Sequence, residues 1–101
     1  MTLFLRLDDD VIDEASFTGH GCAVSQASAD MMADLVTGET VEEARRLVDV
    51  FLKMVKGETL TDKEREDLDQ AAELESISRM PARVKCAELA WRTLDKALEG
   101  R

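Results

Sequence analysis

The chain has 101 residues, of which 45% are apolar and 35% are charged, and its formal net charge is −9. This length and balance indicate one globular domain rather than a disordered segment. The acidic balance excludes nucleic acid and anionic membranes as expected partners, because both require a basic protein surface. We also expect a cytoplasmic location, since no apolar run is long enough for a signal peptide or for a membrane span of ~20 residues.

The pattern of residues 2–18 predicts a β-hairpin. Leucine alternates with other side chains along residues 3–7, as in a half-buried strand. The aspartates at positions 8–10 predict its turn rather than a metal site, since aspartate favours turns through local hydrogen bonds. In an antiparallel pair, the first strand starts beside the end of the second. The start of the chain should therefore lie near Gly19–Cys22, with the aspartate turn roughly 20 Å away.

Four helices are expected after the hairpin. Apolar side chains recur at helical spacing in each of them, and Thr40 and Thr61 open capping-box patterns. Gly38 and Gly57 are expected to end the first two helices, and Pro81 fits the first turn of the last one. The third helix is mostly charged and should lie on the surface. The expected spans are Ser25–Thr37, Thr40–Gly57, Thr61–Glu75, and from after Ser78 to about Leu98.

Cys22 is the first of two residues that carry the expected chemistry. It lies at the start of the first helix, where unpaired amides and the positive end of the helix dipole stabilise a thiolate. The thiolate is both the nucleophilic and the metal-binding form of cysteine. Gly19 and Gly21 allow turns that a Cβ would forbid. His20 is a candidate zinc ligand, a candidate proton donor or a plain surface residue.

Cys86 is the second of these residues, and it lies one turn into the last helix, beside the apolar stripe. Arg83 is three residues earlier on the same face, so its charge either favours a thiolate at Cys86 or forms a salt bridge at the helix start. From spacing alone, two cysteines are a weak signal, because structural zinc normally takes four ligands. Two unreactive buried cysteines remain an alternative.

Two segments resemble the motifs of a known family. Residues 19–29, Gly-His-Gly-Cys-Ala-Val-Ser-Gln-Ala-Ser-Ala, resemble the second-cysteine motif of the U-type iron–sulfur assembly proteins. Residues 78–87, Ser-Arg-Met-Pro-Ala-Arg-Val-Lys-Cys-Ala, resemble their third-cysteine motif. The Pro-Ala-Arg form with Lys85 before the cysteine is similar to the SufU branch rather than the IscU branch. The long segment between the cysteines and the hairpin sequence are also similar to SufU, so the likeness covers essentially the whole chain.

The resemblance implies an α+β fold, in which a small antiparallel sheet (hairpin 2–18) packs against about four helices in a single domain over residues 1–101. It implies a zinc or iron–sulfur site of three cysteines and an aspartate, with Cys22 and Cys86 as two of the ligands. His20 and Arg83 would then be neighbours of the site. It further implies a role in iron–sulfur cluster assembly, as a zinc-dependent sulfur acceptor or as a scaffold, with a cysteine desulfurase as the partner that donates persulfide sulfur.

One motif of the family is missing from this chain. The family's first-cysteine motif, a Cys-Gly-Asp preceded by Asn-Pro, comes immediately before the strand that here begins at Met1. It supplies one cysteine, the aspartate and, in SufU-type members, the expected sulfur acceptor, so whether this chain is an enzyme stays open. We expect a shortened form that binds zinc weakly or is metal-free, which a native mass equal to that of 101 residues would contradict. We also expect the exposed edge of Thr2–Leu7 to pair with a second copy in a homodimer.

Two other functions remain open. One is an acidic helical interaction module with two structural cysteines and no metal, whose thiols would react slowly until the protein unfolds. The other is a redox enzyme that uses a Cys22–Cys86 disulfide, which mass analysis of both redox states tests. Fast alkylation of both thiols, slowed by added zinc, favours the metal site over the interaction module.

Overall fold

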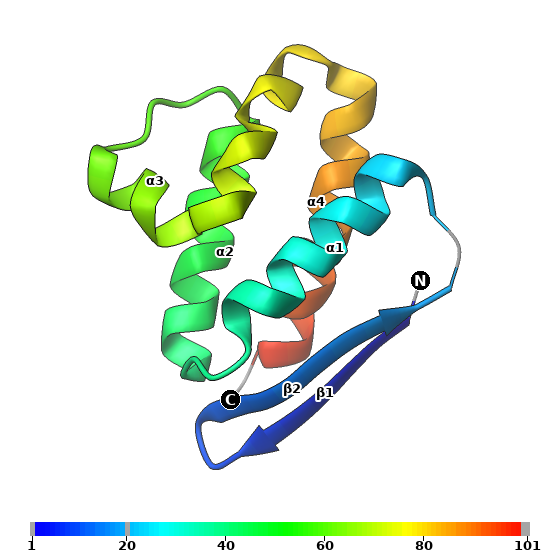
Figure 1. The fold of residues 1–101 in the computed structure, drawn as a ribbon, viewed down its shortest axis with the longest axis vertical. Helices are drawn as coiled ribbons and strands as arrows, with labels where there is room; N and C mark the ends of the chain where they lie inside the picture. The colour runs from blue at the N-terminus through cyan, green and yellow to red at the C-terminus, as the bar shows by residue number, and fades with distance from the viewer. Residues whose placement is uncertain (1, 20, 100–101) are drawn as a thin grey trace.

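A β-hairpin followed by four α-helices makes up the computed structural model, which describes residues 2–19 and 21–99 (Figure 1). This arrangement confirms the expected α+β class, with a hairpin over residues 2–18 packed against helices. A 3-10 helix separates the third α-helix from the fourth. The elements are, in chain order, β1 (Thr2–Asp8), β2 (Val11–Thr18), α1 (Ala23–Val36), α2 (Val41–Val55), α3 (Asp62–Leu68), the 3-10 helix (Asp69–Arg79) and α4 (Pro81–Leu98).

A bulge in the hairpin explains the weak alternation of its second strand. β1 pairs antiparallel with β2, and the register shifts between Arg6 and Leu7, which leaves Asp13 as an extra residue on β2. An extra residue moves the side chains beyond it to the opposite face of the strand. Ile12 is therefore fully buried on the same face as the half-buried Ala15, although strict alternation would have placed it in solvent.

The turn end of the hairpin is fixed to the connection between α1 and α2. Three backbone hydrogen bonds of 2.6–2.8 Å join residues 10–12 to residues 38–41. At the opposite end of the hairpin, Thr2 pairs with Thr18, shortly before the chain enters α1. The aspartate turn and the Cys22 loop therefore lie at opposite ends of the hairpin, as the antiparallel pairing predicts.

The starts of α1 and α2 differ slightly from the sequence prediction. α1 begins at Ala23, two residues earlier than expected, because Cys22 itself caps the helix. At the start of α2 the Thr40 hydroxyl accepts a hydrogen bond from the backbone N–H of Glu43 at 3.1 Å, as predicted. The Glu43 carboxylate, however, binds Arg46 at 2.6 Å, so only one half of the expected capping box is formed.

The prediction of a third helix over Thr61–Glu75 is wrong in its second half. Its capping box is complete, because Glu64 exchanges two hydrogen bonds with the N-cap threonine, at 3.1 and 2.9 Å. α3 nevertheless ends at Leu68, since Asp69 has a φ of 51° and a ψ of −124°, which interrupts the helical run of dihedral angles. The apolar side of this segment continues in the 3-10 helix, where Ala71 is buried.

The core lies between α1, α2 and α4. Its largest member is Trp91, whose indole ring stacks on Phe51 with 4.0 Å between the ring centroids and 7° between the ring planes. The hairpin lies along one side of this helical core, and α3 lies on the far side, beyond α2 (Figure 1). Within the described ranges, no helix combines the length and the apolar character needed to cross a membrane.

Candidate functional site

Cys22 occupies the N-cap of α1, a position usually taken by a residue with a side-chain oxygen. Its Sγ accepts a hydrogen bond from the backbone N–H of Ser25 at 3.4 Å. The Ser25 hydroxyl in turn donates to the Cys22 carbonyl at 2.9 Å, which closes a small ring of hydrogen bonds around the first turn. The thiol is exposed to solvent, so it is both oriented by the helix and accessible to a ligand.

These contacts favour the ionised form of Cys22. The Ser25 backbone N–H, the Ser25 side chain and the neighbouring Cys86 thiol together lower the pKa of Cys22 to about 7, with the backbone N–H as the largest cause. A donor aimed at sulfur stabilises a thiolate more than a thiol. The Cys22 thiol therefore ionises more readily than an ordinary cysteine thiol.

Cys86 lies beside Cys22 although it comes from α4, and it titrates in the opposite direction. Its pKa is raised from the ordinary value, first by its hydrogen bond to Cys22, then by burial and then by the negative charge of Cys22. The Arg83 charge lowers this pKa, which is the direction of one of its two readings from the sequence, but the nearby Cys22 outweighs it. The single Cys86 proton has a second acceptor in the Ala82 carbonyl, 3.8 Å from the sulfur. The pair therefore retains one proton when Cys22 ionises.

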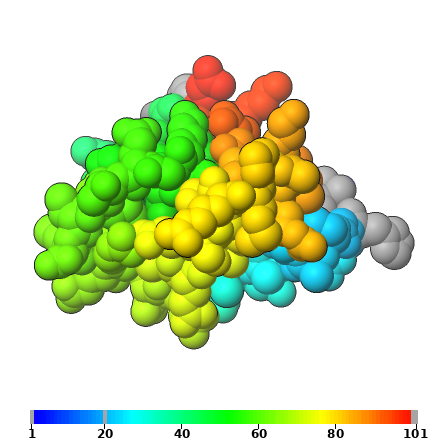
Figure 2. All heavy atoms as spheres, turned by 90° about the horizontal axis from the view of Figure 1, so that it is seen from above, coloured from blue at the N-terminus to red at the C-terminus, as the bar shows by residue number. Residues whose placement is uncertain are grey.

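The two thiols lie at the end of the molecule where the starts of α1 and α4 meet. Figure 2 looks onto this end, and the first turns of α4, in orange, lie directly against the start of α1, in light blue. Both cysteines are free rather than joined in a disulfide. The fold thus brings together two residues that are 64 positions apart in the sequence.

Among the described residues, the metal-binding donors around these thiols are fewer than a structural zinc site needs. Among residues 2–19 and 21–99, no group of three or more His, Cys, Asp or Glu side chains is arranged to hold a metal. Structural zinc sites normally have four ligands, and Cys22 and Cys86 supply two suitable ones. His20, the third candidate from the sequence, lies outside the described residues. The described residues therefore supply some, but not all, of the ligands that a metal ion would need here.

Two further residues shape the Cys22 loop, and the sequence prediction missed both. The sequence prediction gives Ser25 no role beyond the first residue of the helix, although its spacing of three from Cys22 is the spacing of an N-cap contact. The Gln26 side-chain amide donates to the Gly21 carbonyl at 3.1 Å and so braces the loop from α1. No pattern in the sequence identified this second contact, because a surface glutamine has many possible roles.

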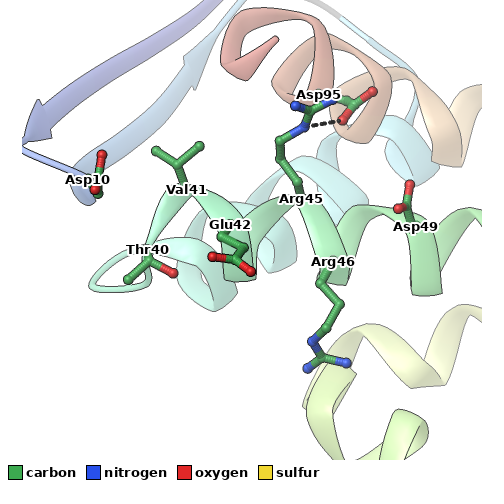
Figure 3. A pocket seen from close by; sticks show the side chains of 8 residues that line it. All are labelled: Asp10, Thr40, Val41, Glu42, Arg45, Arg46, Asp49 and Asp95. Carbon is green, nitrogen blue, oxygen red and sulfur yellow. Dashed lines mark hydrogen bonds and ion pairs between the residues drawn. The ribbon is translucent and has the colours of Figure 1, made fainter. Parts of the chain in front are cut away.

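A polar groove lies away from the thiol pair (Figure 3). An ion pair between Arg45 of α2 and Asp95 of α4, with 3.3 Å between Nε and Oδ1, crosses it. Asp95 follows Cys86 by nine residues, which is about 13 Å along a helix. The lining residues are Asp10, Thr40, Val41, Glu42, Arg45, Arg46, Asp49 and Asp95. The two thiols therefore lie outside this groove.

Similar sequences are found among proteins of iron–sulfur metabolism. The iron–sulfur cluster assembly scaffold protein IscU of Streptococcus pyogenes serotype M1 is 37% identical over 99 residues, which are 98% of this chain and 61% of that protein. The zinc-dependent sulfurtransferase SufU of Bacillus subtilis is 38% identical over 96 residues, which are 95% of this chain and 64% of that protein. The chain thus spans a little over three fifths of the length of these two relatives.

Solved structures show the same fold. A crystal structure of a candidate iron–sulfur cluster assembly scaffold protein for the SUF system from Fervidobacterium islandicum superposes with a TM-score of 0.90 at 34% identity, covering 96% of this chain and 69% of that one. A crystal structure of a hypothetical protein gives a TM-score of 0.88 at 38% identity, covering 96% of this chain and 70% of the other. Residues 1–100 match the family described as the NifU-like N terminal domain. With the sequence, the fold and the relatives in agreement, the chain belongs to the NifU-like N-terminal domain family.

Proposed function

We propose that this chain acts in iron–sulfur cluster assembly, with Cys22 and Cys86 as two ligands of a zinc or iron–sulfur site. The observation that carries this proposal is the thiol pair, in which two free cysteines from different helices lie close enough for each to shift the pKa of the other. The pKa of Cys22, near 7, favours it further, because the thiolate is the form that binds metals. The relatives named IscU and SufU support the same role.

Zinc is the metal that we favour for the pair. When bound, zinc would stabilise both sulfurs as thiolates, so binding would release the remaining Cys86 proton. With two protein thiols alone the affinity should be low, because structural zinc takes four ligands. The further ligands would come from outside the described residues, where His20 is one candidate. Both thiols must stay reduced for this chemistry, and the cytoplasm maintains that state.

Zinc binding by cysteine variants tests the site. Cys22→Ser and Cys86→Ser should each abolish zinc binding, measured by competition with a chromogenic chelator. Asp10→Asn is the matched control, because it changes a carboxylate at the opposite end of the hairpin and should leave zinc binding unchanged. A zinc affinity that neither cysteine variant changes would overturn the proposal.

A second version of the protein sharpens this test. Because Thr2 pairs with Thr18 close to the Cys22 loop, a Cys-Gly-Asp segment joined ahead of Thr2 would begin at the thiol end of the hairpin. This version should bind zinc more tightly than the 101-residue chain, since it offers a third thiol and a carboxylate. Equal affinities in the two versions would exclude a ligand role for the added segment.

A cysteine desulfurase is the partner that we propose for the site, and side chains around Cys86 support docking there. Leu89 is one turn after Cys86 and 47% exposed, and Met80 at the start of α4 is 43% exposed. Arg83 and Lys85 are exposed between them. Apolar side chains among charged ones are typical of interfaces between proteins. Leu89→Asp should weaken binding to the desulfurase in calorimetry without changing zinc binding, and an unchanged affinity would contradict docking on this face.

A second copy of the chain is a further partner that we propose, through β1. In the described part of the chain, β1 pairs only with β2, so its other edge offers unpaired backbone groups. Phe4 is 55% exposed beside that edge and adds apolar area to the contact. Phe4→Lys should shift any dimer to monomer in sedimentation velocity. A wild-type chain that sediments as a monomer at high concentration would exclude the dimer.

The competing interaction module with two inert buried cysteines fits this structure less well. It requires both thiols to be inaccessible, whereas Cys22 is exposed at the N-cap of α1. Alkylation of the native protein would separate the two readings, because an inert cysteine reacts only after unfolding.

A further inference from the structure

A buried pair of hydrogen bonds joins α1 to α4 behind the two thiols. The Ser28 hydroxyl donates to the Ala87 carbonyl at 2.7 Å and accepts from the Trp91 indole N–H at 2.8 Å. Ser28 and Trp91 have no solvent exposure. Ala87 directly follows Cys86, so the first bond reaches the residue next to one of the thiols.

The Ser28 hydroxyl touches α4 at two points. Ala87 and Trp91 are four residues apart and therefore lie on one face of α4, a turn from each other. Two contacts from one short side chain fix both the separation of the helices and the position of one along the other. A purely apolar contact would restrict sliding less, because dispersion forces have little directionality compared with hydrogen bonds.

The surrounding side chains allow this close contact and support it. α1 presents Ser25, Ser28 and Ala29 as buried small residues, and α4 presents Ala87 and Ala90 in the same way. A serine hydroxyl reaches only about one bond beyond Cβ, so its 2.7 Å contact with a backbone carbonyl requires the two helices to approach closely.

Trp91 extends this arrangement to a third helix. Its ring stacks on Phe51 of α2 with 4.0 Å between the centroids. Packing of the ring therefore fixes the position of the indole N–H that donates to Ser28. Every polar atom in the contact has a partner, which is the condition under which a buried polar group specifies a single arrangement rather than destabilising the core.

We propose that Ser28 and Trp91 are positioning residues for the thiol pair, and that their buried hydrogen bonds hold α1 and α4 where Cys22 and Cys86 can bind one atom together. Neither residue touches the ligand. This inference rests on the proposed function of the pair as joint ligands. It adds an explanation of what fixes the distance between the two thiols.

A bridging arsenical measures that spacing without metal and without a partner protein. Phenylarsine oxide reacts with two adjacent thiols to form two As–S bonds and release one water molecule. The wild-type chain should form this one-to-one adduct, identified by mass, and its affinity follows from competition with dithiothreitol. Ser28→Ala should weaken the affinity on the order of tenfold, as is typical when a residue that orients ligands is removed.

Val36→Ala is the matched control. Val36 is also fully buried on α1, but it lies fourteen residues from Cys22, about 21 Å along the helix. It should lower stability and leave arsenical affinity at the wild-type value. Trp91→Phe keeps an aromatic ring against Phe51 but removes the N–H donor together with the five-membered ring that carries it, so it should weaken the adduct several-fold. Circular dichroism confirms that each variant is folded under the assay conditions.

The outcomes separate this inference from the proposed function. A wild-type chain that forms no bridged adduct would overturn both, because the thiols would not be adjacent. A bridged wild type with equal affinity in Ser28→Ala would overturn the positioning role alone, as would an equal loss in Val36→Ala. If Ser28→Ala fails to fold, Trp91→Phe decides, and a wild-type affinity in that variant would overturn the role.

Discussion

The contact between α1 and α4 and the segment around α3 are held together by different forces. At the first, small side chains pack closely, and buried hydrogen bonds cross from Ser28 to α4. At the second, charged pairs on the surface make most of the polar contacts, such as Arg46 with Asp67 at 2.9 Å and Lys53 with Glu64 at 3.3 Å. Surface ion pairs contribute about 0–1 kcal/mol each. The thiols are therefore attached to the more strongly packed of the two regions.

The largest expected effect comes from the centre of the packed region. Trp91→Ala removes a fully buried ring that stacks on Phe51, and such losses cost about 3–5 kcal/mol of unfolding free energy. Urea denaturation followed by circular dichroism measures this change. A cost below about 1 kcal/mol would mean that the α1–α4 contact is no better packed than the region around α3.

The second prediction concerns the ionisation of the thiols. The rate of iodoacetamide alkylation at Cys22 should rise with pH and reach half its maximum near pH 7, because its pKa is lowered by the Ser25 N–H and thiolate forms above that value. Cys86 should react only at higher pH, since Cys22 raises its pKa. At pH 7 the rates should differ by more than about tenfold. Peptide mass spectrometry of labelled protein gives both rates.

A reciprocal pair of variants controls this prediction. Cys22→Ala should lower the pKa of Cys86, because it removes the group that raises it most. Cys86→Ala should raise the pKa of Cys22 only slightly, since the Ser25 contacts that dominate its lowering remain. Equal pH profiles for the two thiols in the wild type would contradict the geometry of the site.

A smaller effect is expected at the start of α3. Thr61→Ala removes a complete capping box, and loss of such a cap costs about 1 kcal/mol. The loss should appear as faster proteolytic cleavage within residues 58–68, while the alkylation rate of Cys22 stays at its wild-type value. A change in Cys22 reactivity would show that the two regions are coupled rather than independent.

The smallest effect is expected from a single ion pair. Arg65 and Glu75 connect α3 to the 3-10 helix, and both side chains are 41% exposed. Arg65→Ala should therefore cost less than about 0.5 kcal/mol of unfolding free energy. Thermal unfolding of this variant and of Trp91→Ala, measured side by side, compares the loss of stability in the two regions. A loss comparable to that of Trp91→Ala would invalidate the comparison.

Much of the fold follows from local patterns in the sequence. The hairpin, the start of α2 at Thr40 and the last helix were predicted because each has a strong periodicity or cap. The break at Asp69 was not, since the helical pattern of charged residues continues through it and only its positive φ ends the helix. The bulge at Asp13 was not predicted either, because a change of register is not marked by any particular type of residue.

The sequence points to the residues of the candidate site but not to how they are organised. Motif resemblance points to Cys22 and Cys86 as ligands, and of the two readings left open for Arg83, its charge acts on Cys86 in the direction that favours a thiolate. The net rise in the pKa of Cys86 was not predicted, because it depends on the distance between two thiols that are 64 positions apart. The contact of Ser28 with Ala87 was missed too, since a serine inside an apolar stripe is compatible with either a surface or a buried position.

The attachment of the hairpin to the helices has a consequence for the exchange of backbone amides with solvent. Short backbone hydrogen bonds hold residues 10–12 against residues 38–41, so amide exchange at Ile12, Gly38 and Val41 should be slow. Near Thr18 the strand ends and the Cys22 loop begins. Leu3, Leu5 and Phe17 pack against the core on the way to that loop, so the strand that leads into the loop should also exchange its amides slowly.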